Sequence, residues 1–398
     1  MNTLFPYLGF LLLPVAAASG WWLAKQGERS ERERLNGLSF SYFQGLNCLV
    51  NQEQERAIDL FSQLLEDEPE MVETHLALGT LFRKQGDTSQ AIQLHSNLVS
   101  SENLSQEQRA LALLELGRDY MKAGLLDRAE SPFLDLIELG LHLQDAYAYL
   151  VVIYQQEQEW DRAIEMLRRQ QKSGQASALI VERGRATIAQ FLCEKAEIAR
   201  VSSDLKEAGH LVDQALREDP CAGRATMIRA EIYATTGQKQ LAIESYKSIE
   251  QQNASYIPSI IQPLLVLYRE VRAAEEVLEY LNTLLETHPS TTVLLATVGQ
   301  IQLMQGGRKA ELYLVAQLKK RPSVRGLEQL INLNLTHAEE PTAREGLLGL
   351  QTLTRQLQEE KPEYQCTQCG FQGHNLHWQC PGCNHWNTIK PIVGVSGE

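Results

Sequence analysis

The middle of the chain repeats one helical pattern with a period close to 34 residues, and this repeat constrains the fold more than any other feature. Six alanines hold the same place in the pattern: Ala57, Ala91, Ala129, Ala163, Ala208 and Ala242. Their spacings are 34, 38, 34, 45 and 34 residues. Twelve positions earlier stand mostly small residues, namely Gly45, Gly79, Gly117, Val151, Ala196 and Ala230. Aromatic residues recur at two further fixed offsets, as Phe82, Tyr120, Tyr154 and Tyr233 and as Phe61, Phe133 and Tyr246.

This period, with small and aromatic residues at fixed offsets, is typical of the tetratricopeptide repeat, in which each copy is a pair of antiparallel helices. Alanine and leucine at helical spacing also occur in the core of any helical bundle, but several copies in register favour the repeat. We expect residues 38–360 to form eight or nine helical hairpins, the last one degenerate. The two long spacings predict insertions near residues 99–106 and 170–186. Prolines at positions 69, 220, 289 and 322 are expected to end the second helix of a hairpin.

Stacked repeats of this kind form a superhelix whose concave surface usually binds peptides or protein segments. The sequence contains none of the Gly-x-Ser-x-Gly, His-Glu-x-x-His, Walker or Gly-x-Gly-x-x-Gly motifs, so we predict that the protein is not an enzyme. A net charge of -13 and a pI near 5.3 argue against a general nucleic-acid binder. Charged stretches such as Arg118-Asp119 and Glu275-Glu276 are expected to be solvated helix faces.

Near the C-terminus, four of the seven cysteines form two Cys-x-x-Cys pairs. These are Cys366-Thr-Gln-Cys369 and Cys380-Pro-Gly-Cys383. Four thiolates so arranged suit one tetrahedral zinc or iron ion. Two disulfides or two thioredoxin-like redox pairs are the alternatives, but both pairs lie in turn-rich sequence rather than at a helix start.

A module spanning residues 361–398 is too small to fold by apolar burial alone, so we predict a structural metal in it. The four cysteines complete a closed ligand shell that leaves no position for a water. His374, His377 and His385 lie nearby and are expected to be surface or packing residues. The other three cysteines are scattered, which together with the thiolate site favours a reducing compartment.

The N-terminus predicts a single membrane span. Residues 1–24 carry no charged side chain, and residues 4–24 would extend roughly 31 Å as a helix, which matches a bilayer core. Residues 25–37 form a charged juxtamembrane linker. A cleaved signal peptide is the alternative, but its positive charges should precede the apolar run, and here they follow it. By the positive-inside rule, the rest of the chain is expected in the cytoplasm.

The order of these parts resembles the lipopolysaccharide assembly protein B family of Gram-negative bacteria. Local matches support the resemblance: Leu11-Leu-Leu-Pro14-Val-Ala-Ala-Ala18 with Gly20-Trp21, Gly117-Arg-Asp-Tyr-Met-Lys-Ala-Gly124 with Asp127-Arg-Ala-Glu130, Tyr364-Gln-Cys366-Thr-Gln-Cys369-Gly370-Phe371, Trp378-Gln-Cys380-Pro381-Gly-Cys383, Trp386, and Thr388-Ile-Lys390-Pro391-Ile392. The expected fold is therefore an all-α tetratricopeptide-repeat superhelix with an N-terminal transmembrane helix and a small, rubredoxin-like four-cysteine ribbon.

The resemblance implies an adaptor in the bacterial inner membrane with most of its chain facing the cytoplasm. In that family, the adaptor promotes degradation of the lipid A deacetylase LpxC by the membrane-bound AAA+ zinc protease FtsH. The resemblance also implies contacts with other lipopolysaccharide-assembly proteins, a ribbon packed on the repeats, and Cys366, Cys369, Cys380 and Cys383 as metal ligands. A membrane-anchored scaffold without a proteolytic role and an iron-containing electron carrier are the alternatives, and a homo-oligomer stays open.

Overall fold

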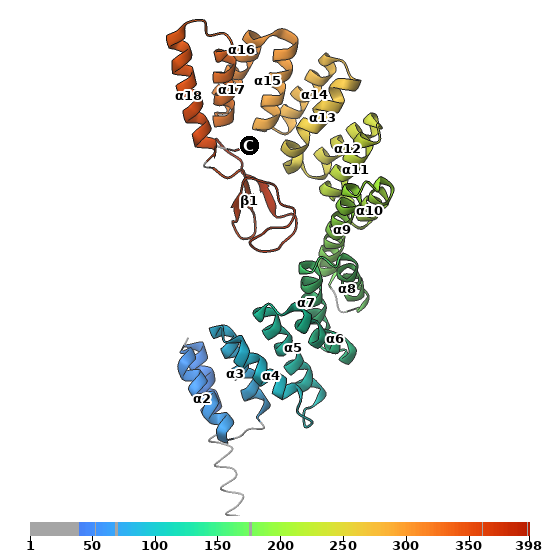
Figure 1. Ribbon diagram of the computed structural model, residues 1–398, viewed down its shortest axis with the longest axis vertical. Coiled ribbons are helices and arrows are strands. Elements are labelled where there is room, and N and C mark those ends of the chain that lie inside the picture. Colours follow the sequence, from blue (N-terminus) through green and yellow to red (C-terminus); the bar gives the residue numbers. More distant parts are fainter. Residues whose placement is uncertain (1–39, 52, 68–70, 175–176, 360, 396) are drawn as a thin grey trace, which may run out of the picture. The chain divides into compact units, whose positions relative to one another are not determined.

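The computed structural model describes residues 40–398 except 52, 68–70, 175–176, 360 and 396 (Figure 1). It divides into two compact units, Met1–Glu159 and Trp160–Glu398, which we describe separately. The predicted anchor at 1–24 and the linker at 25–37 lie outside the described residues. None of the helices in the described ranges has the length and apolar character needed to cross a bilayer.

The first unit contains successive antiparallel helices. Residues 40–50 are helical and are followed by α2 (Gln54–Asp67), α3 (Val72–Gln85), α4 (Thr88–Val99), α5 (Gln106–Ala123), α6 (Leu126–Leu139) and α7 (Leu143–Gln156). Each of α3 to α6 packs on the next helix along the chain. This is the arrangement that the repeat pattern predicts.

The second unit continues the same pattern. Its helices are α8 (Trp160–Lys172), α9 (Ala178–Val201), α10 (Leu205–Glu218), α11 (Gly223–Thr235), α12 (Lys239–Gln252), α13 (Ile257–Val271), α14 (Ala274–Thr287), α15 (Thr291–Gln305), α16 (Gly307–Lys320), α17 (Val324–Leu335) and α18 (Pro341–Glu359), with a 3-10 turn η1 (Ala254–Tyr256) before α13. In the described residues, the first unit has seven helices and the second has eleven, a number in keeping with the predicted eight or nine hairpins.

The small residues of the repeat let the two helices of a hairpin approach closely. All six repeat alanines are fully buried. A Cβ atom added to Gly45 would lie 2.7 Å from the Phe61 ring, and one added to Gly117 would lie 2.6 Å from the Phe133 ring. Helix propensity does not favour glycine here, so close packing against the aromatic ring explains its presence.

The predicted interruptions and three of the four predicted helix ends are also observed, while the fourth, at Pro69, lies outside the described residues. The long spacings correspond to longer helices, since α5 has 18 residues and α9 has 24, each preceded by a non-helical segment. Helices α10, α14 and α16 end two residues before Pro220, Pro289 and Pro322. Proline excludes the preceding residue from helical backbone angles, which accounts for this spacing.

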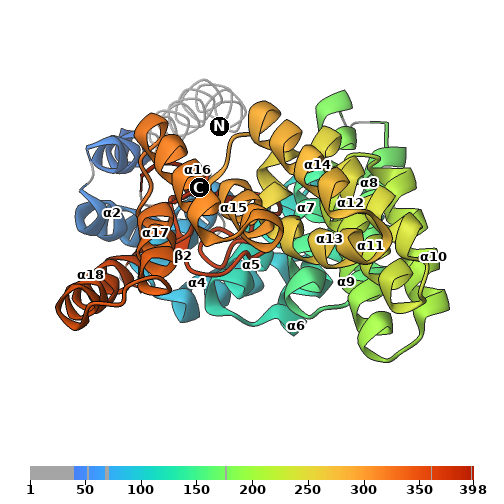
Figure 2. The same cartoon turned by 90° about the horizontal axis from the view of Figure 1, so that it is seen from above.

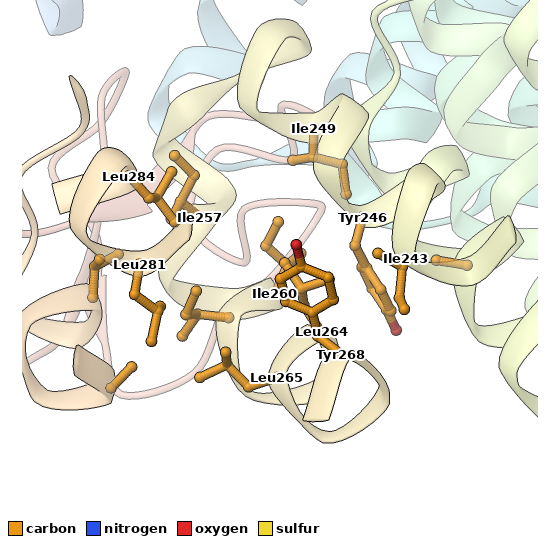
Figure 3. Packing of buried hydrophobic residues seen from close by; sticks show 14 of the residues in the cluster. Ile243, Tyr246, Ile249, Ile257, Ile260, Leu264, Leu265, Tyr268, Leu281 and Leu284 are labelled. Atoms are coloured by element: carbon orange, nitrogen blue, oxygen red, sulfur yellow. The ribbon is translucent and has the colours of Figure 1, made fainter. Parts of the chain in front are cut away.

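A large apolar cluster connects α11 to α15 in the second unit (Figure 3). Its labelled members are Ile243, Tyr246, Ile249, Ile257, Ile260, Leu264, Leu265, Tyr268, Leu281 and Leu284. Leu376 and Trp378, from the C-terminal module, pack against this cluster. The core of the repeats is therefore continuous with the surface that receives the module.

The first unit contains a buried charged network that corrects one prediction. Asp119 was expected on a solvated helix face, but its side chain is completely buried. Its Oδ1 accepts a hydrogen bond of 2.7 Å from Arg83, and its Oδ2 lies 2.5 Å from Nδ1 of His95. His95 stands where two other repeats have Phe61 and Phe133, so a polar side chain fills an aromatic position and Asp119 compensates for it. Glu275 and Glu276 are exposed, as predicted.

The strands of the small C-terminal module lie within residues 364–391. Its three-stranded antiparallel sheet has the order β2-β1-β3, with β1 (Tyr364–Cys366), β2 (Gln372–Gly373) and β3 (Ile389–Pro391). In this register Gln365 pairs with Gln372 on one side and with Lys390 on the other. The strands are only two or three residues long, so the module has little sheet to stabilise it.

Candidate metal centre

The four predicted cysteines come together at one point of the C-terminal module. All four sulfur atoms lie within 4.8 Å of one another. The Sγ atoms of Cys366 and Cys383 are 3.7 Å apart, and those of Cys369 and Cys380 are 3.6 Å apart. Four sulfurs around a tetrahedral zinc ion, at about 2.3 Å each, would be separated by about 3.8 Å. The donor set therefore fits one structural metal ion with a closed tetrahedral shell.

Two similar turns position the ligands. Gly370 donates its backbone N–H to the carbonyl of Cys366 at 3.0 Å, and Asn384 does the same to Cys380 at 2.8 Å. Gly370 and Asn384 have φ angles of 77° and 57°, a left-handed conformation that closes each turn. A Cβ atom added to Gly382 would lie 3.3 Å from Sγ of Cys369, so this position has little room for a side chain.

The surroundings of the sulfurs affect their ionisation in opposite ways. Burial raises the pKa of Cys366, but the Thr388 hydroxyl and the Cys369 and Gln368 backbone outweigh it and lower this pKa to about 6. The His385 backbone lowers the pKa of Cys383, whereas burial and the neighbouring thiols raise it, to about 12. Metal binding must therefore displace protons from some of the thiols.

We expect the affinity of the site for its metal to decline on acidification. Protons compete with the metal for the four thiolates, so each step to lower pH favours the protonated, metal-free site. Transfer of the metal to a chromophoric chelator, followed from about pH 8 to about pH 5, measures the effect. The variant Cys221→Ser should behave like the unmodified chain, and a release rate independent of pH would contradict the prediction.

The remaining candidate ligands lie outside this cluster. His374, His377 and His385 are exposed, as predicted, and Nδ1 of His385 lies 2.9 Å from the carbonyl of Cys383. All seven cysteines are free, so the structure contains neither of the alternative disulfides. Cys48 and Cys193 are buried and Cys221 is exposed, each away from the four-cysteine cluster.

The module docks on the repeats of the second unit through a stack of aromatic and cationic side chains. Trp378 lies with its ring centre 5.1 Å from that of Tyr256. The guanidinium of Arg224 lies 5.5 Å from the Trp378 ring, and Nζ of Lys390 lies 4.1 Å from the Tyr256 ring. Arg224 is buried and forms a 2.8 Å ion pair with Glu194. These cation–π contacts join Trp378 and Lys390 of the module to helix α11 and the turn η1.

Two further contacts extend the docked surface in both directions along the repeats. Trp386 meets the buried ring of Phe191 edge to face, with 5.8 Å between ring centres. At the other end, the Glu398 carboxylate accepts a 3.1 Å hydrogen bond from the Thr292 backbone N–H and a 2.7 Å one from Arg325. Thr292 is in the first turn of α15, where a negative charge is stabilising. The module thus contacts the first helices of several successive pairs.

Sequence reasoning predicted the ligands but not the residues of this docking surface. The available signal was the presence of Trp378 and Trp386 in a module too small to bury two tryptophans by itself. Their partners Tyr256, Arg224 and Phe191 have no unusual spacing in the sequence, so the repeat pattern does not distinguish them from ordinary helix residues.

Comparison with known proteins supports both parts of this description. Residues 364–391 match the family model described as rubredoxin metal binding domain, and residues 74–106 and 193–257 match tetratricopeptide repeat models. Lipopolysaccharide assembly protein B of Escherichia coli strain K12 is 35% identical over 389 residues, which cover 98% of this chain and 98% of that protein. The chain belongs to the lipopolysaccharide assembly protein B family.

The lipopolysaccharide assembly protein B of Haemophilus influenzae is more distant. It is 30% identical over 392 residues, which cover 96% of this chain and 97% of that protein. The match to the lipopolysaccharide assembly protein B family thus runs essentially from end to end, and the resemblance inferred from the sequence is confirmed. It includes the repeats, the docked module and the N-terminal apolar segment.

Replacing Trp378 with Ala is expected to release the module from the repeats while leaving its metal bound. Loss of a half-buried tryptophan and its contacts with Tyr256 and Arg224 should cost about 2–3 kcal/mol of docking free energy. Limited proteolysis of the 360–398 region, together with the metal content, measures both effects. His374→Ala, an exposed change in the same module, is the control. Equal protease resistance of the two variants would show that Trp378 does not hold the module.

Proposed function

We propose that this protein is a non-catalytic adaptor that regulates lipopolysaccharide biosynthesis. In this proposal it presents the lipid A deacetylase to the membrane protease FtsH for degradation. The observation that carries the proposal is the match to lipopolysaccharide assembly protein B over 98% of both chains, because such a match covers every part an adaptor would use. The tetratricopeptide fold supports it, since stacked repeats commonly bind protein segments.

Each part of the chain has a role in this proposal. Residues 4–24 hold the protein in the bacterial inner membrane with a single pass, and the repeats face the cytoplasm and bind the deacetylase. Attachment to the same membrane as the protease raises the effective concentration of the bound client. The repeats would also meet other lipopolysaccharide-assembly proteins.

The metal has a structural role in this proposal. Cys366, Cys369, Cys380 and Cys383 are its four ligands, and zinc or iron would suit them. A closed shell of four sulfurs leaves no position for a reacting water. The docked tryptophans would then be held in place by the ion, which makes the module part of the adaptor's surface. An absorption spectrum of the purified protein distinguishes the metals, because an iron–thiolate centre is red and a zinc centre is colourless.

The test is the half-life of the lipid A deacetylase in cells with and without this protein. A chain lacking residues 1–24 is the comparison, because it keeps every residue that the structure describes. We expect a longer half-life without the protein, and no rescue by the shortened chain. An unchanged half-life would reject the proteolytic role and favour a scaffold for lipopolysaccharide-assembly proteins.

A further inference from the structure

Helix α16 has a strongly basic outer face in a chain whose net charge is -13. Arg308, Lys309, Lys319 and Lys320 are exposed along this helix, and Arg321 follows directly after it. In the described part of the chain, none of these five side chains forms an ion pair. Glu311 is the one acidic residue in the helix. The face therefore carries a local excess of positive charge that the protein itself does not neutralise.

The position of two of these cations is not explained by helix stability. Lys319 and Lys320 are in the last turn of α16, where the helix dipole favours positive charge. Arg308 and Lys309 are in the first turn, where the same dipole disfavours it. The N-cap residue is Gly306, which supplies no capping side chain. In the described residues neither cation of this first turn forms an ion pair, so we infer that their charge serves an external partner.

An apolar side chain lies among the cations. Leu312, in α16, is 65% exposed. Positions 308, 312 and 319 fall on one side of a helix with 3.6 residues per turn, and 309, 316 and 320 lie beside them. The opposite side of α16 holds the buried residues Ala310 and Leu314. This combination of cations and an exposed leucine on one face is typical of helices that rest on an anionic membrane surface.

The face is also in the wrong place for a peptide in the concave groove. The module at residues 364–398 is bound by the first helices of the pairs, through Phe191 in α9, Arg224 in α11, Thr292 in α15 and Arg325 in α17. Helix α16 is a second helix, and it packs on α15 and α17 (Figure 2). Its cations therefore belong to a helix outside the row that binds the module.

We propose that the basic face of α16, defined by Arg308, Lys309, Leu312, Lys319, Lys320 and Arg321, docks on the anionic phospholipid headgroups of the membrane that holds the chain. Charge complementarity supplies the attraction, and Leu312 enters the boundary between headgroups and acyl chains. This inference rests on the membrane attachment in the proposed function, but not on the deacetylase or the protease. It adds a second membrane contact, about 300 residues after the anchor, that would orient the repeats relative to the bilayer.

The experiment is a lysine-reactivity footprint of the full chain in lipid nanodiscs. The discs contain either neutral phospholipid alone or neutral phospholipid with about one quarter phosphatidylglycerol. Acetylation rates of Lys309, Lys319 and Lys320 are measured by mass spectrometry, with exposed Lys206 in α10 as the internal control. We expect the three rates to fall at least about threefold in the anionic discs, while the rate of Lys206 stays unchanged.

Two further arms make the result specific. The variant Arg308→Glu with Arg321→Glu should lose the protection at Lys319 and Lys320, since both changes are exposed and leave the packed side of α16 intact. Raising the salt to about 0.5 M should also abolish the protection, because it shortens the Debye length well below about 10 Å.

Equal rates in neutral and anionic discs would overturn the proposal and indicate an acidic protein as the partner of this face. A general fall that includes Lys206 would overturn it as well, since the protection would not belong to α16. The footprint does not depend on deacetylase turnover. Failure of this inference is therefore distinguished from failure of the proposed adaptor role, which the half-life experiment tests.

Discussion

Replacing Cys380 and Cys383 with Ser is expected to unfold the C-terminal module, free it from the repeats and abolish function. The apolar core of the module contains only Cys366, Cys380 and Ile389 as buried residues, so two of its three members are themselves metal ligands. Bound zinc contributes on the order of 10 kcal/mol to the folding of such small domains. The remaining contacts of three strands with two or three residues each cannot replace that amount.

Three measurements follow this result. Metal content should fall from one ion per chain to none, proteolysis should remove the region after residue 360 rapidly, and the half-life of the deacetylase should lengthen to that of cells without the protein. Cys221→Ser is the matched control, because Cys221 is an exposed cysteine outside the module. Unaltered protease sensitivity together with full activity in the double variant would show that the metal does not hold the module in place.

The second large effect is expected in the first unit, where Asp119→Ala should reduce the free energy of unfolding by about 3–5 kcal/mol. Asp119 is fully buried between Arg83 and His95, which come from α3 and α4. Removing the carboxylate leaves Arg83 with Glu115 alone, at 2.5 Å, and leaves Nδ1 of His95 without that contact. The side chain of Arg83 is only 15% exposed, and a cation in such a place that loses part of its compensation is costly, whereas the intact pair contributes little net stability.

Urea unfolding followed by circular dichroism measures this effect. Glu138→Ala, an exposed acidic residue in α6, should change the free energy by no more than about 0.5 kcal/mol. The double variant His95→Phe with Asp119→Leu should recover the part of the loss that comes from His95, because it places a phenylalanine where other repeats have one, while the part that comes from Arg83 remains. A cost below about 1 kcal/mol for Asp119→Ala would mean that the network does not stabilise the unit.

The sequence predicted those parts of the structure that depend on local spacing. The positions of Ala57 to Ala242 identified the hairpins, because a side chain larger than alanine cannot fit where the two helices meet. Two Cys-x-x-Cys turns predicted a four-sulfur cluster, because the ligands within each turn are close in the chain. In both cases the physical constraint acts over a few residues and is therefore visible in one sequence.

Contacts between distant residues could not be predicted in this way. The burial of Asp119 depends on His95, 24 residues earlier. The one indication in the sequence was that the polar His95 stands where other repeats have Phe61 and Phe133. The docking of Trp378 depends on Tyr256 and Arg224, which lie 122 and 154 residues earlier in the chain. The sequence likewise does not distinguish zinc from iron, since both accept four thiolates.

The docking surface on the repeats of the second unit is synthesised before the C-terminal module that covers it. Lys390 meets Tyr256, 134 residues earlier in the chain, and Trp386 meets Phe191, earlier still. At about 5–20 residues per second, the ribosome needs on the order of ten seconds or more to make the intervening segment. During that time Phe191, Arg224 and Tyr256 of the repeats have no contact with the C-terminal module. In a chain that ends before residue 364, or whose module has no metal, we expect the docking surface on the repeats to stay uncovered. The complete surface therefore forms only on full-length chains that have bound their metal.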